Sequence, residues 1–142
     1  MISHVHNNIF RGPRPTNLKQ LASDGINSII NLESGFYEMF HEDKYETQFP
    51  CDFGIKEYNI PLSDFSSPDF DKVFLAINIM TKGEPTYIHC LHGKDRTGFV
   101  CAVYRMLHQG WSYEKARKEM LDYGFHTIPY SFWLYKLKHW EK

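Results

Sequence analysis

A chain of 142 residues with 42% hydrophobic content is long enough to bury one core and too short for two ordinary domains, so we expect a single domain over residues 1–142. The formal net charge of −1 at pH 7 lacks the basic excess of proteins that bind nucleic acids or anionic membrane surfaces, which argues against both classes. Three cysteines without disulfide spacing, and no long apolar stretch or signal-peptide pattern, predict a cytoplasmic protein that does not insert into membranes.

The first part of the chain is typical of a strand, a helix and a second strand. Residues 8–12 can form a short strand, Thr16 offers a cap for a helix of about two turns, and Gly25 can end that helix. The apolar run over residues 26–32 then predicts an interior strand. We therefore expect a strand-helix-strand unit at the start of the domain.

The middle of the chain mixes aromatic and charged residues before a clearer strand and helix. We expect a helix within residues 37–47 and a strand over residues 54–60. Residues 69–82 carry apolar side chains at helical spacing, and Ser67 is the expected cap with Pro68 as the first helical residue.

The last part of the chain predicts one buried strand and three more helices. Tyr87 and Ile88 belong to the strand, and the helices are expected at residues 99–109, 113–123 and 130–140. This order of strands and helices predicts an α/β domain of three layers, with a mixed, largely parallel sheet of about four or five strands flanked by about six helices.

Residues 86–98 join the buried strand to the following helix and carry the reactive groups. Unpaired N–H groups at a helix start, together with the helix dipole, bind oxyanions and favour the thiolate form of Cys90. Arg96 can hold two phosphate oxygens at once, and Thr97 places a hydroxyl beside the sulfur that can help it leave a phosphocysteine. The pattern predicts attack of the thiolate on phosphorus with no metal or cofactor.

The cysteine-dependent protein tyrosine phosphatases share a signature loop of His-Cys, five residues, Arg, and Ser or Thr. This chain is similar to that loop over His89-Cys90-Leu91-His92-Gly93-Lys94-Asp95-Arg96-Thr97-Gly98. The position of the loop after most of the sheet, and its Gly-Lys-Asp-Arg-Thr-Gly run, resemble the atypical dual-specificity branch. The resemblance implies a dual-specificity phosphatase fold and hydrolysis of phosphoinositides, inositol phosphates or phosphotyrosine.

The resemblance also implies roles for individual loop residues. His89 is expected to orient the loop and tune Cys90, and Lys94 adds positive charge at the rim, which favours a multiply phosphorylated head group. The expected substrate-binding residues are His89, Leu91, His92, Gly93, Lys94, Asp95 and Arg96.

A carboxylic acid beside the loop would protonate the leaving group and then activate the attacking water. Asp64 directly follows an expected strand, as the general acid does in dual-specificity relatives, and is the predicted acid. Asp95 is the alternative, because relatives with Lys-Asp in the loop have been argued to use that Asp, although a salt bridge or loop hydrogen bond would also explain it. Asp69 and Asp71 are explained by a helix start.

Several other polar residues have structural explanations. Cys51 and Cys101 are expected to be inert thiols, with a disulfide between Cys51 and Cys90 as an alternative implied by some relatives. Arg11 and Arg14 could be pocket cations, but structural or solvated roles are favoured. The eight histidines show no ligand cluster, so we expect no metal.

The sequence thus predicts a monomeric, cysteine-dependent phosphatase. Its expected partners are a phosphorylated small molecule, a lipid head group or a phosphoprotein. The alternative is a phosphate-binding adaptor without turnover, and the presence of Cys90, Arg96 and Thr97 together argues against it.

Overall fold

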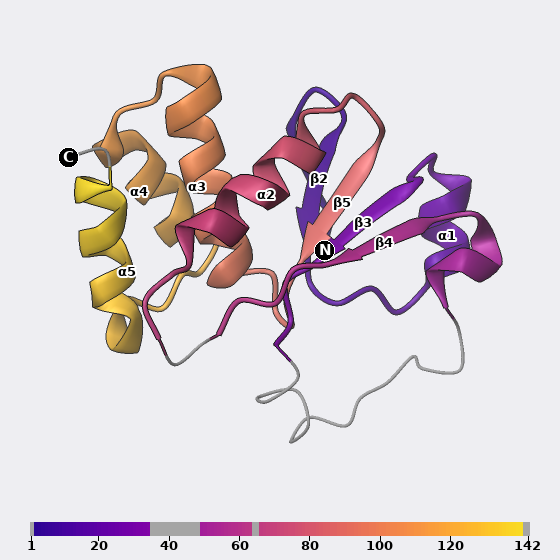
Figure 1. Ribbon diagram of the computed structural model, residues 1–142, viewed down its shortest axis with the longest axis horizontal. Helices are drawn as coiled ribbons and strands as arrows, with labels where there is room; N and C mark the ends of the chain where they lie inside the picture. The colour runs from indigo at the N-terminus through magenta and orange to yellow at the C-terminus, as the bar shows by residue number, and fades with distance from the viewer. Residues whose placement is uncertain (1, 35–48, 64–65, 141–142) are drawn as a thin grey trace.

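The computed structural model describes residues 2–34, 49–63 and 66–140, and it contains a five-stranded sheet with the strand order β1-β2-β5-β3-β4. β1 pairs antiparallel with β2, and the other pairs are parallel (Figure 1). The strands are β1 (Ser3–His6), β2 (Ile9–Gly12), β3 (Ser28–Asn31), β4 (Lys56–Asn59) and β5 (Thr86–His89). The predicted α/β class with a mixed, largely parallel sheet is confirmed.

The helices are α1 (Leu18–Ser23), α2 (Phe70–Met80), α3 (Arg96–Gln109), α4 (Tyr113–Asp122) and α5 (Thr127–His139), with a 3₁₀ turn η2 (Pro50–Phe53). α1 and η2 lie on one side of the sheet, whereas α2 and α3 lie on the other with α4 and α5 outside them (Figure 1). Among these described helices, none is long and apolar enough to cross a membrane.

Both faces of the sheet are buried, because helices cover each of them. Neighbouring residues along a strand point to opposite faces and therefore enter different cores. Ile29 and Tyr87 pack with Leu18 and Leu21 of α1 in a smaller core. Ile30 and Ile88 point the other way, into a larger core, and are fully buried. The larger core also contains Val73, Ile77, Phe99, Val103, Trp133 and Leu137 from the helices. This two-sided burial fixes the register of the central strands.

The observed helix starts differ from two predictions. Asn17 rather than Thr16 caps α1, because its side chain accepts a hydrogen bond from the backbone N–H of Gln20. Asp69 rather than Ser67 caps α2 by accepting from the N–H of Asp71 at 3.0 Å. Both caps use a polar residue one or two positions beyond the expected one.

The structure also differs from the expected elements at β1 and at the start of α5. The strand β1 was not expected. It pairs antiparallel with the edge of β2 that β5 leaves open, and Val5 is buried there. α5 includes non-helical backbone at Ile128 and Tyr130, so its regular part begins close to the expected position. The helix expected within residues 37–47 lies outside the described residues.

Parallel pairing gathers the carboxyl ends of three strands at one edge of the sheet. His89 at the end of β5 is in register with Gly12 of β2 on one side and Asn31 of β3 on the other. The loop that contains Cys90 leaves the sheet at this edge, which is where ligands bind in open α/β sheets.

Candidate active site

The loop after β5 forms the floor of a pocket of about 300 Å³. Cys90 comes directly after the strand and is 2% exposed, and α3 begins at Arg96, so the loop ends at a helix N-terminus. The pocket is lined by Cys90, His92, Asp95, Arg96, His126, Ile128, Pro129 and Tyr130. The structure therefore brings a thiol, a guanidinium and two imidazoles around one small cavity.

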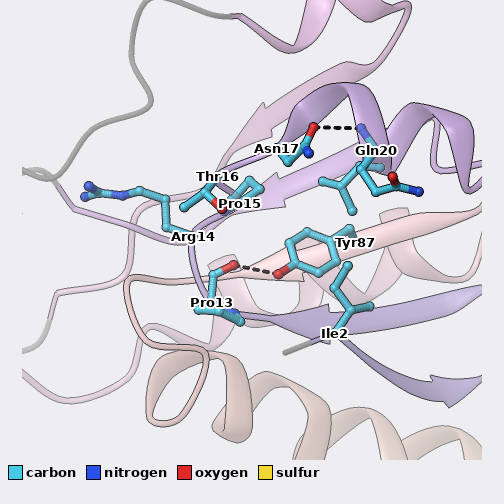
Figure 2. A pocket seen from close by; sticks show the side chains of 9 residues that line it. Ile2, Pro13, Arg14, Pro15, Thr16, Asn17, Gln20 and Tyr87 are labelled. Carbon is cyan, nitrogen blue, oxygen red and sulfur yellow. Dashed lines mark hydrogen bonds between the residues drawn. The ribbon is translucent and has the colours of Figure 1, made fainter.

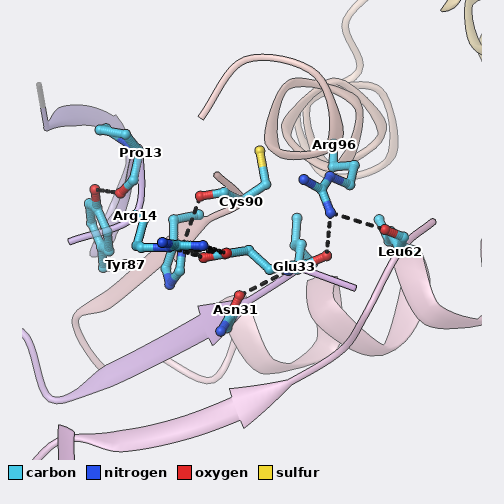
Figure 3. Close-up of polar contacts among 10 residues, drawn as sticks. Pro13, Arg14, Asn31, Glu33, Leu62, Tyr87, Cys90 and Arg96 are labelled. Carbon is cyan, nitrogen blue, oxygen red and sulfur yellow. Dashed lines mark hydrogen bonds and ion pairs between the residues drawn. The ribbon is translucent and has the colours of Figure 1, made fainter. Parts of the chain in front are cut away.

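Arg96 is held in place by backbone oxygens. Its Nη1 donates to the carbonyl of Leu32 at 3.3 Å and to the carbonyl of Leu62 at 3.2 Å. Figure 3 shows the Cys90 sulfur and the Arg96 guanidinium on the same side of the strand ends. Because the arginine is 3% exposed and anchored at the ends of two strands, its orientation does not depend on a ligand.

His89 is enclosed beneath the loop. Burial lowers its pKa to about 4, so the ring is neutral at pH 7. Its Nδ1 lies 3.0 Å from the carbonyl oxygen of Cys90, and since a carbonyl only accepts, this nitrogen carries the proton. The ring thus ties the backbone of the cysteine to the sheet.

A partly buried ion pair supports the loop from below. Arg14 donates through Nε to both carboxylate oxygens of Glu33 at 3.1 Å, and its own backbone N–H donates to Leu91. Figure 3 shows the Arg14 guanidinium over Glu33, beneath Cys90. Glu33 Oε2 also lies 3.5 Å from His89 Nδ1. Arg14 therefore has a structural role, and Glu33 is a supporting residue that the sequence did not single out.

Arg11 supports the far side of the loop. Its Nη2 donates to the carbonyl of Gly93 at 2.9 Å, and its guanidinium lies 3.9 Å from the centre of the Tyr123 ring. Gly93 has φ +73°, and a Cβ atom there would meet the backbone of Gly12 at 2.4 Å. The close approach of the loop to β2 thus requires glycine at this position.

Thr97 and Lys94 lie at different depths. Thr97 is fully buried, and its hydroxyl oxygen has no hydrogen-bond partner among the described residues. Lys94 is exposed and runs along Gly124, where a Cβ atom would lie 3.1 Å from the lysine chain. With His92, Lys94 also lines a second cavity of about 330 Å³ beside the first.

Asp95 stands at the N-cap of α3, but its side chain does not cap that helix. Its Oδ1 instead accepts from the backbone N–H of His126 at 2.7 Å, and the His126 Nδ1 lies 2.9 Å from Oδ2. The sequence pointed to Asp95 but missed His126, because only the fold brings these two positions together.

Asp64, the predicted acid, lies outside the described residues. The described residues on either side of it are anchored: the carbonyl of Leu62 binds Arg96, and the carbonyl of Ser66 accepts from Trp133 Nε1 at 3.0 Å. Asp69 lies at the start of α2, as expected, and it serves there as the cap in place of Ser67.

The remaining cysteines are free thiols. Cys101 is fully buried in α3, and burial raises the pKa of its thiol, whereas Cys51 is exposed. Among the described residues, no group of three or more His, Cys, Asp or Glu side chains could hold a metal ion.

A third cavity, with a largely apolar lining and a volume of about 310 Å³, lies between α1 and the end of β2 (Figure 2). Tyr87 forms one wall of this cavity, and its hydroxyl donates to the carbonyl of Pro13 at 2.6 Å. Burial raises the pKa of this hydroxyl, which favours its protonated form. No cysteine is among the described residues that line this cavity, and Pro13 lines both it and the cavity beside His92 and Lys94.

Comparison with known proteins supports the resemblance. One relative is the dual specificity protein phosphatase TpbA of Pseudomonas aeruginosa, which is 46% identical over 41 residues. This alignment covers 29% of the chain and 19% of TpbA, so the chain matches about a fifth of that relative's length.

Solved structures share the fold over most of the chain. The catalytic domain of the PP-IP phosphatase SIW14 from S. cerevisiae, in complex with citrate, matches with a TM-score of 0.77 and 25% identity, covering 97% of this chain and 83% of that one. A structure of P. aeruginosa TpbA with pTyr matches with a TM-score of 0.66 and 20% identity, covering 87% of this chain and 75% of that one.

The family model Tc-R-P, described as a polymorphic toxin system DSP-PTPase phosphatase, matches residues 10–110. This range contains β3, β4 and β5, all of β2 except Ile9, and the whole reactive loop. The chain therefore belongs to this DSP-PTPase phosphatase family, within the atypical dual-specificity branch of the cysteine-based protein tyrosine phosphatase superfamily.

Proposed function

We propose that the protein hydrolyses phosphomonoesters through a phosphocysteine formed on Cys90. The observation that carries the proposal is the pocket in which the Cys90 thiol and the anchored Arg96 guanidinium lie together at the N-terminus of α3. The thiolate attacks phosphorus, and the leaving group departs with the electron pair of the P–O bond. Arg96 and the loop N–H groups bind the phosphoryl oxygens.

Thr97 and one carboxylic acid complete the proposed chemistry. The buried hydroxyl of Thr97, which has no hydrogen-bond partner among the described residues, is suited to stabilise the sulfur when the phosphocysteine is broken. Asp64 is proposed to protonate the leaving group, since the residues around it are anchored to Arg96 and Trp133. Asp95, which lines the pocket, is the second candidate.

We propose an inositol phosphate, a phosphoinositide or a phosphotyrosyl protein as the substrate. His89, Leu91, His92, Gly93, Lys94 and Asp95 are proposed to line the phosphate site with Arg96. The exposed Lys94 beside a second cavity favours a substrate with more than one phosphate. A substrate panel tests this: faster turnover of inositol polyphosphates or phosphoinositides than of phosphotyrosyl peptides is expected, and the reverse order would contradict it.

Turnover of an aryl phosphate separates the enzyme from a phosphate-binding adaptor. The wild type should release phosphate, and Cys90→Ser should abolish release while phosphate binding persists. A wild type that binds phosphate without any turnover sensitive to Cys90→Ser would instead indicate an adaptor.

A series of aryl phosphates with different leaving groups identifies the acid. Asp64→Asn should slow poor leaving groups more than good ones, because only poor leaving groups need a proton. If Asp95→Asn has this effect and Asp64→Asn does not, the assignment of Asp64 is wrong.

A further inference from the structure

The connection between α4 and α5 places a histidine on the wall of the reactive pocket. His126 lines the same cavity of about 300 Å³ as Cys90 and Arg96, and it comes from a segment far along the chain from the loop. Its side chain is 52% exposed, so water reaches it. A group able to take a proton from water therefore lines the same cavity as the cysteine.

Asp95 fixes which ring nitrogen of His126 is free. The Nδ1 atom lies 2.9 Å from Oδ2 and 3.1 Å from Oδ1 of the carboxylate. A carboxylate accepts but does not donate, so Nδ1 carries a proton and the lone pair of the neutral ring is on Nε2. Nε2 makes no hydrogen bond with any described residue, and it is available to a water molecule in the pocket.

The carboxylate is committed to this contact. Asp95 stands where an aspartate would ordinarily cap α3, yet it makes no capping hydrogen bond to that helix. It turns to both the backbone N–H and the ring of His126. A carboxylate that orients an imidazole beside a nucleophile is the arrangement found where histidine acts as a base.

We propose that His126, oriented by Asp95, is the general base that activates water in the hydrolysis of the phosphocysteine. In this second step His126, rather than the carboxylate of Asp64, takes the proton from water. The inference rests on the proposed function. The water oxygen forms a bond to phosphorus while one water proton passes to His126 Nε2. The P–S bond breaks with its electron pair on the Cys90 sulfur, phosphate leaves, and the imidazolium then returns its proton to solvent.

The first step does not use His126, and this separates its role from that of the acid. Loss of the base should slow only the breakdown of the phosphocysteine, by about 100-fold. The intermediate would then accumulate, and an aryl phosphate would give a burst of about one phenol per enzyme followed by slow turnover. The slow rate should not depend on the leaving group, because that group has already departed.

The test compares two substitutions with a matched control. His126→Asn keeps an N–H donor close to the position of Nδ1, and so can hold Asp95, but it lacks Nε2. His126→Ala removes both, and it opens space for added imidazole. His139→Ala, an exposed histidine at the other end of α5 outside the pocket, is the control.

The expected result is a burst and slow turnover for both His126 variants, restoration of His126→Ala by imidazole, and wild-type kinetics for His139→Ala. Wild-type turnover by His126→Asn would show that the contact between His126 and Asp95 has only a structural role, and it would overturn the proposal. Slow turnover that imidazole does not restore would overturn it as well. A wild type that forms no phosphocysteine after acid quenching would instead refute the proposed function itself.

Discussion

The guanidinium of Arg96 donates from Nη1 to the backbone carbonyl of Leu62 at 3.2 Å, and this bond joins the first turn of α3 to the segment that leaves β4. A second bond to Leu32 joins the same atom to the segment after β3. The arginine therefore links the reactive loop to the segments that follow two neighbouring strands, β3 and β4, before any substrate binds.

Arg96→Lys should lower kcat/KM for an aryl phosphate by about 100-fold or more, because an ammonium group cannot hold two phosphate oxygens in the planar arrangement of a guanidinium. Arg117→Lys, at an exposed position of α4, is the matched control and should leave the rate unchanged. Steady-state kinetics decide, and equal rates for the two variants would contradict the proposed role of Arg96.

The Arg14–Glu33 pair should be important for stability. The side chain of Glu33 is 8% exposed, so Arg14→Ala leaves a nearly buried carboxylate without its partner and should lower the free energy of unfolding by about 3 kcal/mol. Lys118→Ala breaks the exposed Lys118–Asp122 pair and should cost less than about 0.5 kcal/mol. Chemical denaturation measures both values, and similar losses would contradict this account of the partly buried pair.

Alanine substitutions at two glycines with positive φ separate the cost of steric crowding from the cost of backbone strain. At Gly83, where no atom lies within 4 Å of an added Cβ, alanine should cost only the strain of the left-handed backbone, about 1–2 kcal/mol. Gly93→Ala adds a clash at 2.4 Å with Gly12 and should cost clearly more and abolish turnover. Thermal unfolding and activity together test this, and a Gly93→Ala protein with wild-type turnover would show that the loop can move away from β2.

The buried His89 should make stability depend on pH. Its pKa falls from the usual histidine value of 6.5 to about 4 in the fold, so between these values the unfolded chain binds more protons than the folded one. The free energy of unfolding should therefore decrease as pH falls from about 6.5 to 4, by about 3 kcal/mol from this group, and the decrease should stop below pH 4.

Denaturant unfolding of His89→Gln across this pH range checks the effect. The variant should show a smaller dependence on pH than the wild type, whatever its absolute stability. His108→Gln, at an exposed position of α3, should keep the wild-type dependence. If His89→Gln also keeps it, the acid sensitivity arises elsewhere.

The local parts of the fold could be predicted from the sequence. The strand-loop-helix around Cys90 carries its own signals, since a short apolar run, a glycine turn and an apolar helix follow one another within about twenty residues. Helix starts could be predicted only to within one or two residues, because adjacent polar residues such as Thr16 and Asn17 can each serve as a cap. The geometry of the backbone selects between them.

Contacts between distant segments could not be predicted in this way. Glu33 and Arg14 meet because parallel strand pairing puts both near the end of β5, and His126 meets Asp95 only when α4 and α5 fold over α3. The strand β1 was missed because Val5 is its single buried apolar side chain, too little for an alternating pattern. These features depend on tertiary structure rather than on local residue patterns.

Rapid acid quenching of the wild type with a labelled aryl phosphate, followed by mapping of the phosphorylated peptide, tests the central proposal most directly. The phosphoryl group should be found on Cys90, with none in Cys90→Ser and the same amount as wild type in Cys101→Ser. Phosphate release by Cys90→Ser at the wild-type rate, or a phosphoryl group on any other residue, would contradict catalysis through this cysteine.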